Sequence, residues 1–132
     1  MQNFNHPVRR FTRNTVILLI VLGMIGAIIL ERQTHILQKT IDDRIYDNRG
    51  HYLSCEELPA LSDVERIVAE HHSLIQAIER VNPGFIFVTI NSPCPGKGEL
   101  IFEYPSHQNR LQIEVLIGGD TFFGIPYRMI NI

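Results

Sequence analysis

The run VILLIVLGMIGAIIL, residues 16–30, decides how this chain is organised, because it holds no polar or charged side chain over fifteen positions. With Thr15 in front, a helix here would be about 24 Å long, against roughly 30 Å for a bilayer core. Arg13 and Arg32 flank the run, and their long side chains can extend to the headgroups on either side. Core helices of soluble proteins rarely lack a polar face over four turns. We therefore predict a transmembrane helix over residues 15–30.

A cleaved signal peptide is the main alternative, because a basic start followed by an apolar run also fits a secretory signal. The residues at the end of the run, Ile28-Ile29-Leu30-Glu31-Arg32, contain no small-x-small cleavage pattern. The triplet Arg9-Arg10-Phe11 resembles a twin-arginine signal, but its neighbours do not continue that motif. The sequence therefore favours an uncleaved single-pass anchor.

The distribution of positive charge predicts the orientation of this anchor. The arm before the run, residues 1–14, contains Arg9, Arg10 and Arg13, whereas the other side has Arg32 and then no lysine or arginine before Lys39. Cytoplasmic flanks carry the excess of Lys and Arg. We expect a cytoplasmic N-terminal arm and an extracytoplasmic C-terminal domain, either periplasmic or on the cell surface.

Residues 31–50 are predicted to form a helical connector that continues outward from the membrane. Leu37, Ile41 and Ile45 recur every four residues and would lie on one side of a helix that ends at Gly50. This apolar side could face a partner subunit or the chain's own domain. A homomeric coiled coil would need three or more heptads, which is longer than this segment.

Residues 51–132 are predicted to form a small α+β domain of two layers. A helix over residues 61–82 is indicated by apolar residues at helical spacing, and Ser62 and Glu65 would form its capping box. Four apolar runs then predict strands: residues 85–90, 99–104, 110–117 and 125–132. Short turn-rich links between strands indicate hairpins. We expect one helix packed on a three- to four-stranded antiparallel sheet.

The two cysteines, Cys55 and Cys94, are predicted to form a disulfide if the domain is extracytoplasmic. Closing a loop of about 40 residues would stabilise the fold by roughly 4 kcal/mol. Two unpaired buried thiols are the alternative. There is no C-x-x-C redox motif and no haem attachment motif, and Cys94-Pro95-Gly96-Lys97 lacks the other residues of a phosphate-binding loop.

No catalytic, metal or cofactor signature stands out among the remaining polar residues. His71 falls within the apolar side of the predicted helix, where a packed core histidine is the simpler interpretation. His107 and Asp120 could meet in space beside Ser106, but no known nucleophile motif surrounds them. Glu99, Glu103 and Glu114 are assigned to the solvated face of the predicted sheet. A net charge of −2 without a basic stripe argues against nucleic-acid binding.

The loop GGDTFFG, residues 118–124, places Phe122 and Phe123 together between glycines. They could fold back over the core, or they could form an apolar contact for a partner protein or the bilayer surface. We expect Phe122, Phe123 and the connector residues Leu37, Ile41 and Ile45 to be the partner-binding residues of the chain.

These features together suggest a non-catalytic accessory subunit of a larger membrane complex, for example a respiratory or photosynthetic one. Its partners would be the lipid bilayer and neighbouring transmembrane subunits. An anchored sensor that captures a peptide or small ligand outside the cytoplasm is the alternative. An anchored hydrolase that uses His107 or His71 is a third hypothesis.

Overall fold

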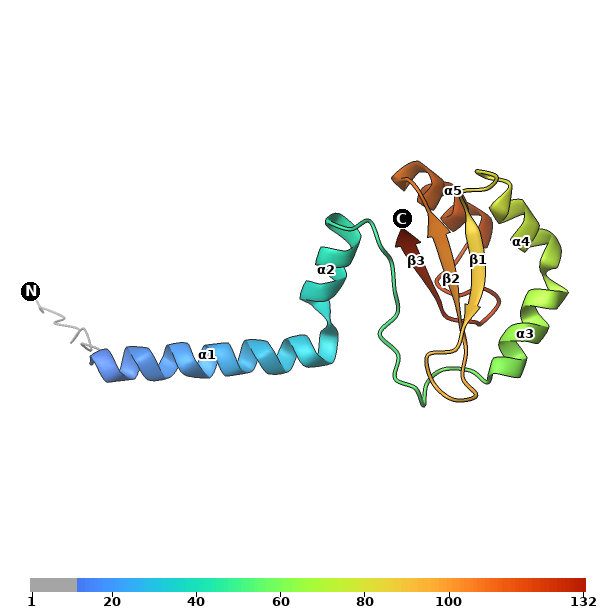
Figure 1. The fold of residues 1–132 in the computed structure, drawn as a ribbon. Helices are drawn as coiled ribbons and strands as arrows, with labels where there is room; N and C mark the ends of the chain where they lie inside the picture. The colour runs from blue at the N-terminus through green and yellow to red at the C-terminus, as the bar shows by residue number, and fades with distance from the viewer. Residues whose placement is uncertain (1–11) are drawn as a thin grey trace, which may run out of the picture. The chain divides into compact units, whose positions relative to one another are not determined.

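The computed structural model describes residues 12–132, which divide into two compact units between Ile36 and Leu37 (Figure 1). Most of the predicted cytoplasmic arm, including Arg9 and Arg10, lies outside the described residues. Most of the predicted connector, from Leu37 onward, lies in the unit that contains the C-terminal domain.

Helix α1, Arg13–Thr34, contains the predicted membrane segment and extends beyond it at both ends. The Thr12 side chain accepts a hydrogen bond from the backbone N–H of Thr15, and the helix stops where His35 adopts a left-handed conformation. No residue of α1 is buried in the structure. Within residues 12–132, α1 alone is long and apolar enough to cross a membrane, a property that an N-terminal signal sequence shares.

The connector is not one continuous helix. Helix α2, Ile36–Arg44, starts after the break at His35, and the chain from Asp47 to Ala60 is largely irregular. The prediction of a helix up to Gly50 is wrong beyond Arg44. The chain leaves the helical conformation there, because Asp47 has a positive φ of 53° and the Asn48 N–H bonds to the Asp42 carbonyl.

The sheet has three strands in the order β1-β2-β3: β1, Phe87–Asn91, β2, Glu99–Tyr104, and β3, Tyr127–Asn131. Strands β1 and β2 are antiparallel, as expected, but β2 and β3 are parallel. A wholly antiparallel sheet is therefore wrong, because a helix connects β2 to β3 and returns the chain to the end from which β2 started.

That connecting helix is α5, His107–Ile117, where the sequence predicted a strand over residues 110–117. The Ser106 side chain caps its first turn, and Gly118 ends it in the left-handed conformation with a φ of 72°. Ile113 is fully buried, whereas Val115 is 80% exposed. In a strand, Ile113 and Val115 would lie on the same face and be buried to a similar extent. The alternation of apolar and polar residues therefore predicted the wrong element here.

The predicted helix over residues 61–82 is divided into α3, Leu61–Glu70, and α4, His72–Glu79. The break falls at His71, which has φ −108° and ψ 25°, with no glycine or proline beside it. The predicted capping box is also wrong. Ala60 is the N-cap and makes no side-chain bond, so Ser62 lies inside the first turn.

Helices α3, α4 and α5 pack on one face of the sheet, so the domain has the two layers expected of an α+β fold (Figure 1). Leu100, Phe102 and Tyr104 alternate along β2 and are completely buried on this face. They contact buried residues of all three helices, including Val64, Ile78 and Ile113. The layer of helices thus contains three helices instead of the one that was predicted.

Candidate functional site

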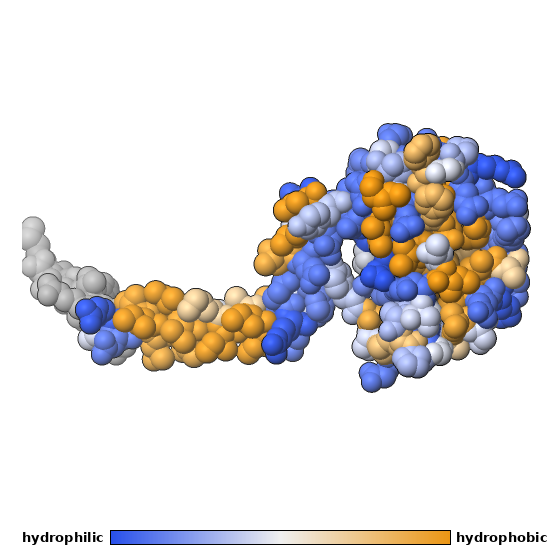
Figure 2. Space-filling model, in the orientation of Figure 1, coloured by the Kyte–Doolittle hydropathy of each residue, from blue (hydrophilic) through white to orange (hydrophobic). Residues whose placement is uncertain are grey.

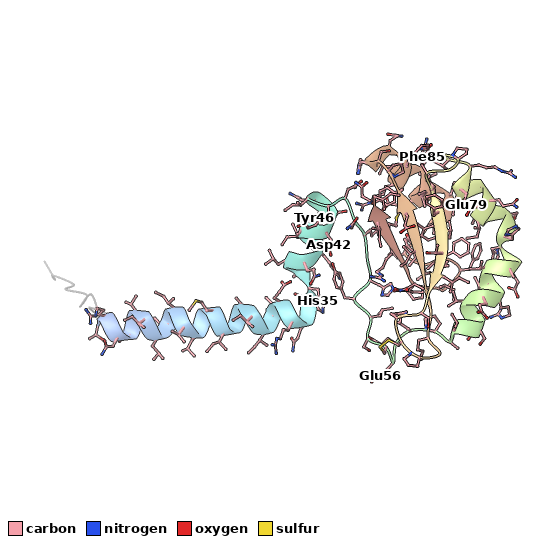
Figure 3. All side chains as sticks on the ribbon, in the orientation of Figure 1. His35, Asp42, Tyr46, Glu56, Glu79 and Phe85 are labelled. Carbon is pink, nitrogen blue, oxygen red and sulfur yellow. A yellow bond between two sulfur atoms is a disulfide. The ribbon has the colours of Figure 1, made fainter. Side chains whose placement is uncertain are left out.

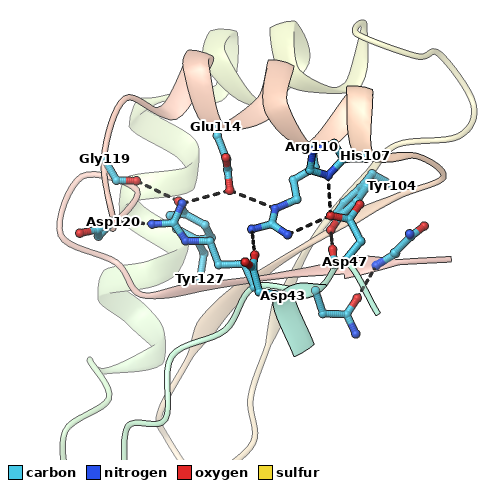
Figure 4. Close-up of polar contacts among 12 residues, drawn as sticks. Asp43, Asp47, Tyr104, His107, Arg110, Glu114, Gly119, Asp120 and Tyr127 are labelled. Carbon is cyan, nitrogen blue, oxygen red and sulfur yellow. Dashed lines mark hydrogen bonds and ion pairs between the residues drawn. The ribbon is translucent and has the colours of Figure 1, made fainter. Parts of the chain in front are cut away.

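The most connected polar residue of the domain is Arg110 on α5, which is only 7% exposed (Figure 4). Its guanidinium lies 2.9 Å from Asp47 and 3.1 Å from Glu114, and it also bonds to Asp43 of α2. Burial would lower the pKa of Arg110, but hydrogen bonds to the three carboxylates outweigh it and raise the pKa. This cluster attaches the connector to the domain.

Arg49 extends the same network along the outer edge of β3. It bonds to Glu114 at 3.0 Å and to Asp120 in the loop after α5 (Figure 4). Its backbone also pairs with Met129 through two hydrogen bonds of 3.0 and 2.6 Å. The irregular chain after α2 therefore covers the edge of β3.

The histidine and aspartate that a hydrolase would need do not pair with each other. His107 lies 2.7 Å from Asp47, while Asp120 bonds to Arg49. The Ser106 hydroxyl bonds to Asn109 at 2.9 Å and caps α5. The side chains that suggested a nucleophile, a base and an orienting acid are thus engaged in holding the fold.

Glu99 was assigned to the solvated face of the sheet, but the structure buries it to 2% exposure. It is held by His51 at 2.7 Å, by Asn91 at 2.6 Å and by the guanidinium of Arg128. Burial lowers the pKa of His51, the attraction of Glu99 opposes this effect, and the nearby Arg128 adds to it. The three half-buried side chains surround the buried Glu99 in a polar cluster on the face of the sheet opposite the helices.

The disulfide joins Cys55 and Cys94, with 5.9 Å between their Cα atoms. It lies beside the Glu99 cluster and, together with His51 and Arg128, lines a cavity of about 340 Å³. Cys55 belongs to the irregular chain before α3, and Cys94 to the loop between β1 and β2. The predicted bond therefore attaches the irregular chain before α3 to the loop between β1 and β2. A disulfide is typical of oxidising compartments, which agrees with a domain outside the cytoplasm.

The two adjacent phenylalanines have different environments. Phe122 is fully buried in the core and exchanges two backbone hydrogen bonds with Ile125. Phe123 is 54% exposed and stacks on the ring of His71 at a centroid distance of 3.4 Å. Its φ of 51° is rare for a bulky side chain, and Gly124 follows with a φ of 88°. Phe122 is thus a core residue, and Phe123 alone could contact a partner.

The connector side chains that were expected to contact a partner remain largely at the surface. Leu37 is 60% exposed and Ile45 is 69% exposed, while Ile41 is half-buried. Tyr46, labelled in Figure 3, follows them and is 58% exposed.

Large apolar side chains are also exposed on two further surfaces of the domain. One is the free edge of the sheet at β1, together with the residue labelled Phe85 in Figure 3. The other is the outer side of α5, which borders a shallow groove. The residues are Phe85, Phe87 and Ile90 at the edge, and Leu111, Val115 and Leu116 on the helix.

Among residues 12–132, no group of three or more His, Cys, Asp or Glu side chains is arranged to hold a metal ion. Comparison of the chain with protein-family models, with curated proteins and with solved structures found no match. The assignment of a function therefore depends on the surfaces and contacts described above.

Proposed function

We propose that this chain is a single-pass, non-catalytic accessory subunit of a larger membrane complex, with a cytoplasmic N-terminus and an extracytoplasmic domain. The observation that carries the proposal is the free edge of β1. In the described part of the chain, β1 is paired on one side only, and its sequence, FVTIN, contains no charge and no proline. Monomeric proteins commonly protect such an edge with charges, prolines or a covering segment.

The other end of the sheet shows what a protected edge looks like in this molecule. There Arg49 and Met129 pair through their backbones, and the Asn131 N–H bonds to the Asn48 side chain. An edge that is covered at β3 and uncovered at β1 is the arrangement expected if a strand of another protein pairs with β1.

Helix α1 supports the membrane part of the proposal. All of its large apolar side chains are exposed, and Gly23 and Ala27 are spaced four apart, as small residues are where two transmembrane helices approach closely. A Cβ added at Gly23 would meet nothing within 4 Å, which leaves room for a neighbouring helix.

The test is purification of the native protein in mild detergent, combined with crosslinking in native membranes. We expect other membrane proteins to co-purify and to crosslink near Phe87. Phe87→Lys places a charge on the free edge and should reduce this co-purification. Ser62→Lys, on the exposed side of α3, is the matched control and should leave it unchanged. Elution of the unmodified chain as a lone monomer without crosslinked neighbours would refute the proposal.

A ligand-binding or sensor module is the second candidate, and one cavity favours it. An open cavity of about 580 Å³ lies between α2, the following chain and α5, lined in part by Lys39, Arg44, Arg49 and Arg110. Arg49 and Arg110 are already paired with carboxylates, so an anionic ligand would be held by Lys39 and Arg44. Thermal unfolding with and without citrate or inorganic phosphate tests this reading, since a bound anion raises the midpoint.

A further inference from the structure

Helix α2 contacts its own domain with its polar side. Asp43 bonds to Arg110 on α5, Asp42 accepts a hydrogen bond of 2.6 Å from the Tyr52 hydroxyl, and the Lys39 ammonium lies 5.5 Å from the Tyr52 ring centre. An amphipathic helix on a globular domain normally turns its apolar side inward and its charges outward. In α2, the charged groups of Lys39, Asp42 and Asp43 face the domain.

The helical geometry directs the apolar residues of α2 the other way. At 3.6 residues per turn, Ile41 and Ile45 lie on the side opposite the direction of Asp43, and the Ile45 N–H continues the helical bonding to the Ile41 carbonyl at 2.9 Å. Figure 2 shows apolar atoms on the side of α2 that is turned away from the domain. Ile45, in the turn after α2, is 69% exposed, whereas Ile41 is half-buried. The domain itself cannot cover this side while the contacts of Asp42 and Asp43 are intact.

We propose that this apolar side, with Ile41 in α2 and Ile45 in the turn that follows it, lies in the headgroup region of the bilayer that α1 spans. The inference rests on the membrane anchoring proposed above. Its first support is chain continuity, because only His35 separates α2 from the end of α1 at Thr34. Residues so close to the end of a membrane span cannot move far from the membrane surface.

The charges of α2 complement an anionic lipid surface. Asp42 and Asp43 are bound by Tyr52 and Arg110, which leaves Arg44 as an exposed cation beside the apolar side. An interfacial helix typically combines apolar side chains with lysine or arginine. A protein surface fits less well, because a stable interface buries about 800 Å² per partner, more than one short helix side provides.

The experiment uses tryptophan as a reporter, since the chain contains no tryptophan of its own. Three full-length variants, Ile45→Trp, Val115→Trp and Ile20→Trp, are reconstituted into vesicles of phosphatidylcholine and phosphatidylglycerol, with and without brominated acyl chains. Ile45 reports on α2. Val115, 80% exposed on α5, is the matched control on the domain, and Ile20 reports on α1.

We expect the emission of Ile45→Trp to be shifted to the blue and quenched by brominated lipid, whereas Val115→Trp keeps the emission of a tryptophan in water. Adding Arg44→Gln to Ile45→Trp should reduce the quenching in vesicles with phosphatidylglycerol more than in pure phosphatidylcholine.

Each other outcome has a distinct meaning. If Ile20→Trp is quenched but Ile45→Trp behaves like Val115→Trp, the α2 inference fails and the membrane anchor stands. If Ile20→Trp is not quenched, the anchor and the inference fail together. A blue shift of Ile45→Trp without quenching would show that protein covers α2, and equal quenching at Val115 would show no preference for α2. Both results overturn the inference.

Discussion

Arg110 shows how one side chain can hold several parts of this molecule together. Its guanidinium binds carboxylates from α2, from the chain after α2 and from its own helix: Asp43, Asp47 and Glu114. Tyr104 adds a further bond from β2 to the Asp47 carbonyl. Removing the guanidinium would leave these carboxylates without their common partner.

We therefore expect Arg110→Met to lower the free energy of unfolding by about 2 kcal/mol. The loss of a fully buried partner costs about 3–5 kcal/mol, and the solvent access of Asp43 reduces the effect here. Urea denaturation in mild detergent measures it. Arg66→Met is the control, because Arg66 also binds two carboxylates, Asp63 and Glu70, but is 55% exposed. Its replacement should leave the free energy of unfolding nearly unchanged, because water screens these exposed ion pairs. Equal losses for the two variants would contradict this account.

His51 gives a prediction about pH. Burial lowers its pKa from the ordinary 6.5, so the unfolded chain binds the proton more tightly than the folded one. The stabilising contribution is therefore complete above about pH 6.5 and is lost as the pH falls towards the lower pKa of the folded state.

We expect the thermal midpoint of the wild type to fall more steeply below about pH 6.5 than that of His51→Gln, which has no titrating ring. Melting curves of both proteins between neutral and mildly acidic pH provide the comparison. Parallel pH dependence of the two proteins would show that His51 is not responsible. His72→Gln is the control, because His72 is exposed on α4 and should follow the wild type.

At the scale of elements, α5 is the clearest difference between the sequence pattern and the structure. RLQIEVLI alternates apolar and polar residues, which favours a strand, and Leu111 and Val115 are apolar although they are exposed. The residues that indicate a helix lie at its two ends. Ser106 is the N-cap, and Gly118 is the left-handed residue after the last turn.

This difference can be tested with two alanine substitutions. In a strand, residues 113 and 115 would share a face and cost similar amounts of stability. In α5, Ile113→Ala should cost about 3 kcal/mol, because Ile113 is fully buried, and Val115→Ala less than about 0.5 kcal/mol, because Val115 is 80% exposed. Denaturation curves of both variants decide between the two structures.

At the scale of the whole molecule, the disulfide attaches the chain that leaves α2 to the domain it precedes. Cys55 and Cys94 are 39 residues apart in sequence. Without the bond, the unfolded chain would gain the freedom of an open loop of this length. Ion pairs such as Arg49–Glu114 would then have to hold the connector with the remaining packing.

Reduction should lower the free energy of unfolding by about 4 kcal/mol in the chain-entropy model. Thermal unfolding with and without dithiothreitol measures the change, and the double variant Cys55→Ser/Cys94→Ser should match the reduced protein and ignore the reductant. A wild-type midpoint that does not respond to complete reduction would contradict the prediction.

Much of this organisation could be predicted from the local sequence pattern. The apolar run identifies the helix that could cross a membrane, because hydrocarbon requires apolar side chains without interruption over its thickness. The disulfide partners were predictable since the chain has two cysteines. The helical region after Leu61 and the strands β1 and β2 follow from periodicity and turn residues, which act over a few positions. The breaks at His35 and His71 have no such local signal.

Tertiary structure alone decided which side chains meet. Asp47 and Arg110 are 63 residues apart, and nothing near either one indicates the other. The burial of Glu99, the separation of Phe122 from Phe123 and the parallel pairing of β3 likewise depend on how the elements pack. The orientation of the charged side of α2 toward the domain likewise depends on packing. Helical periodicity shows that α2 has two sides, but only the partners on the domain determine which side faces it.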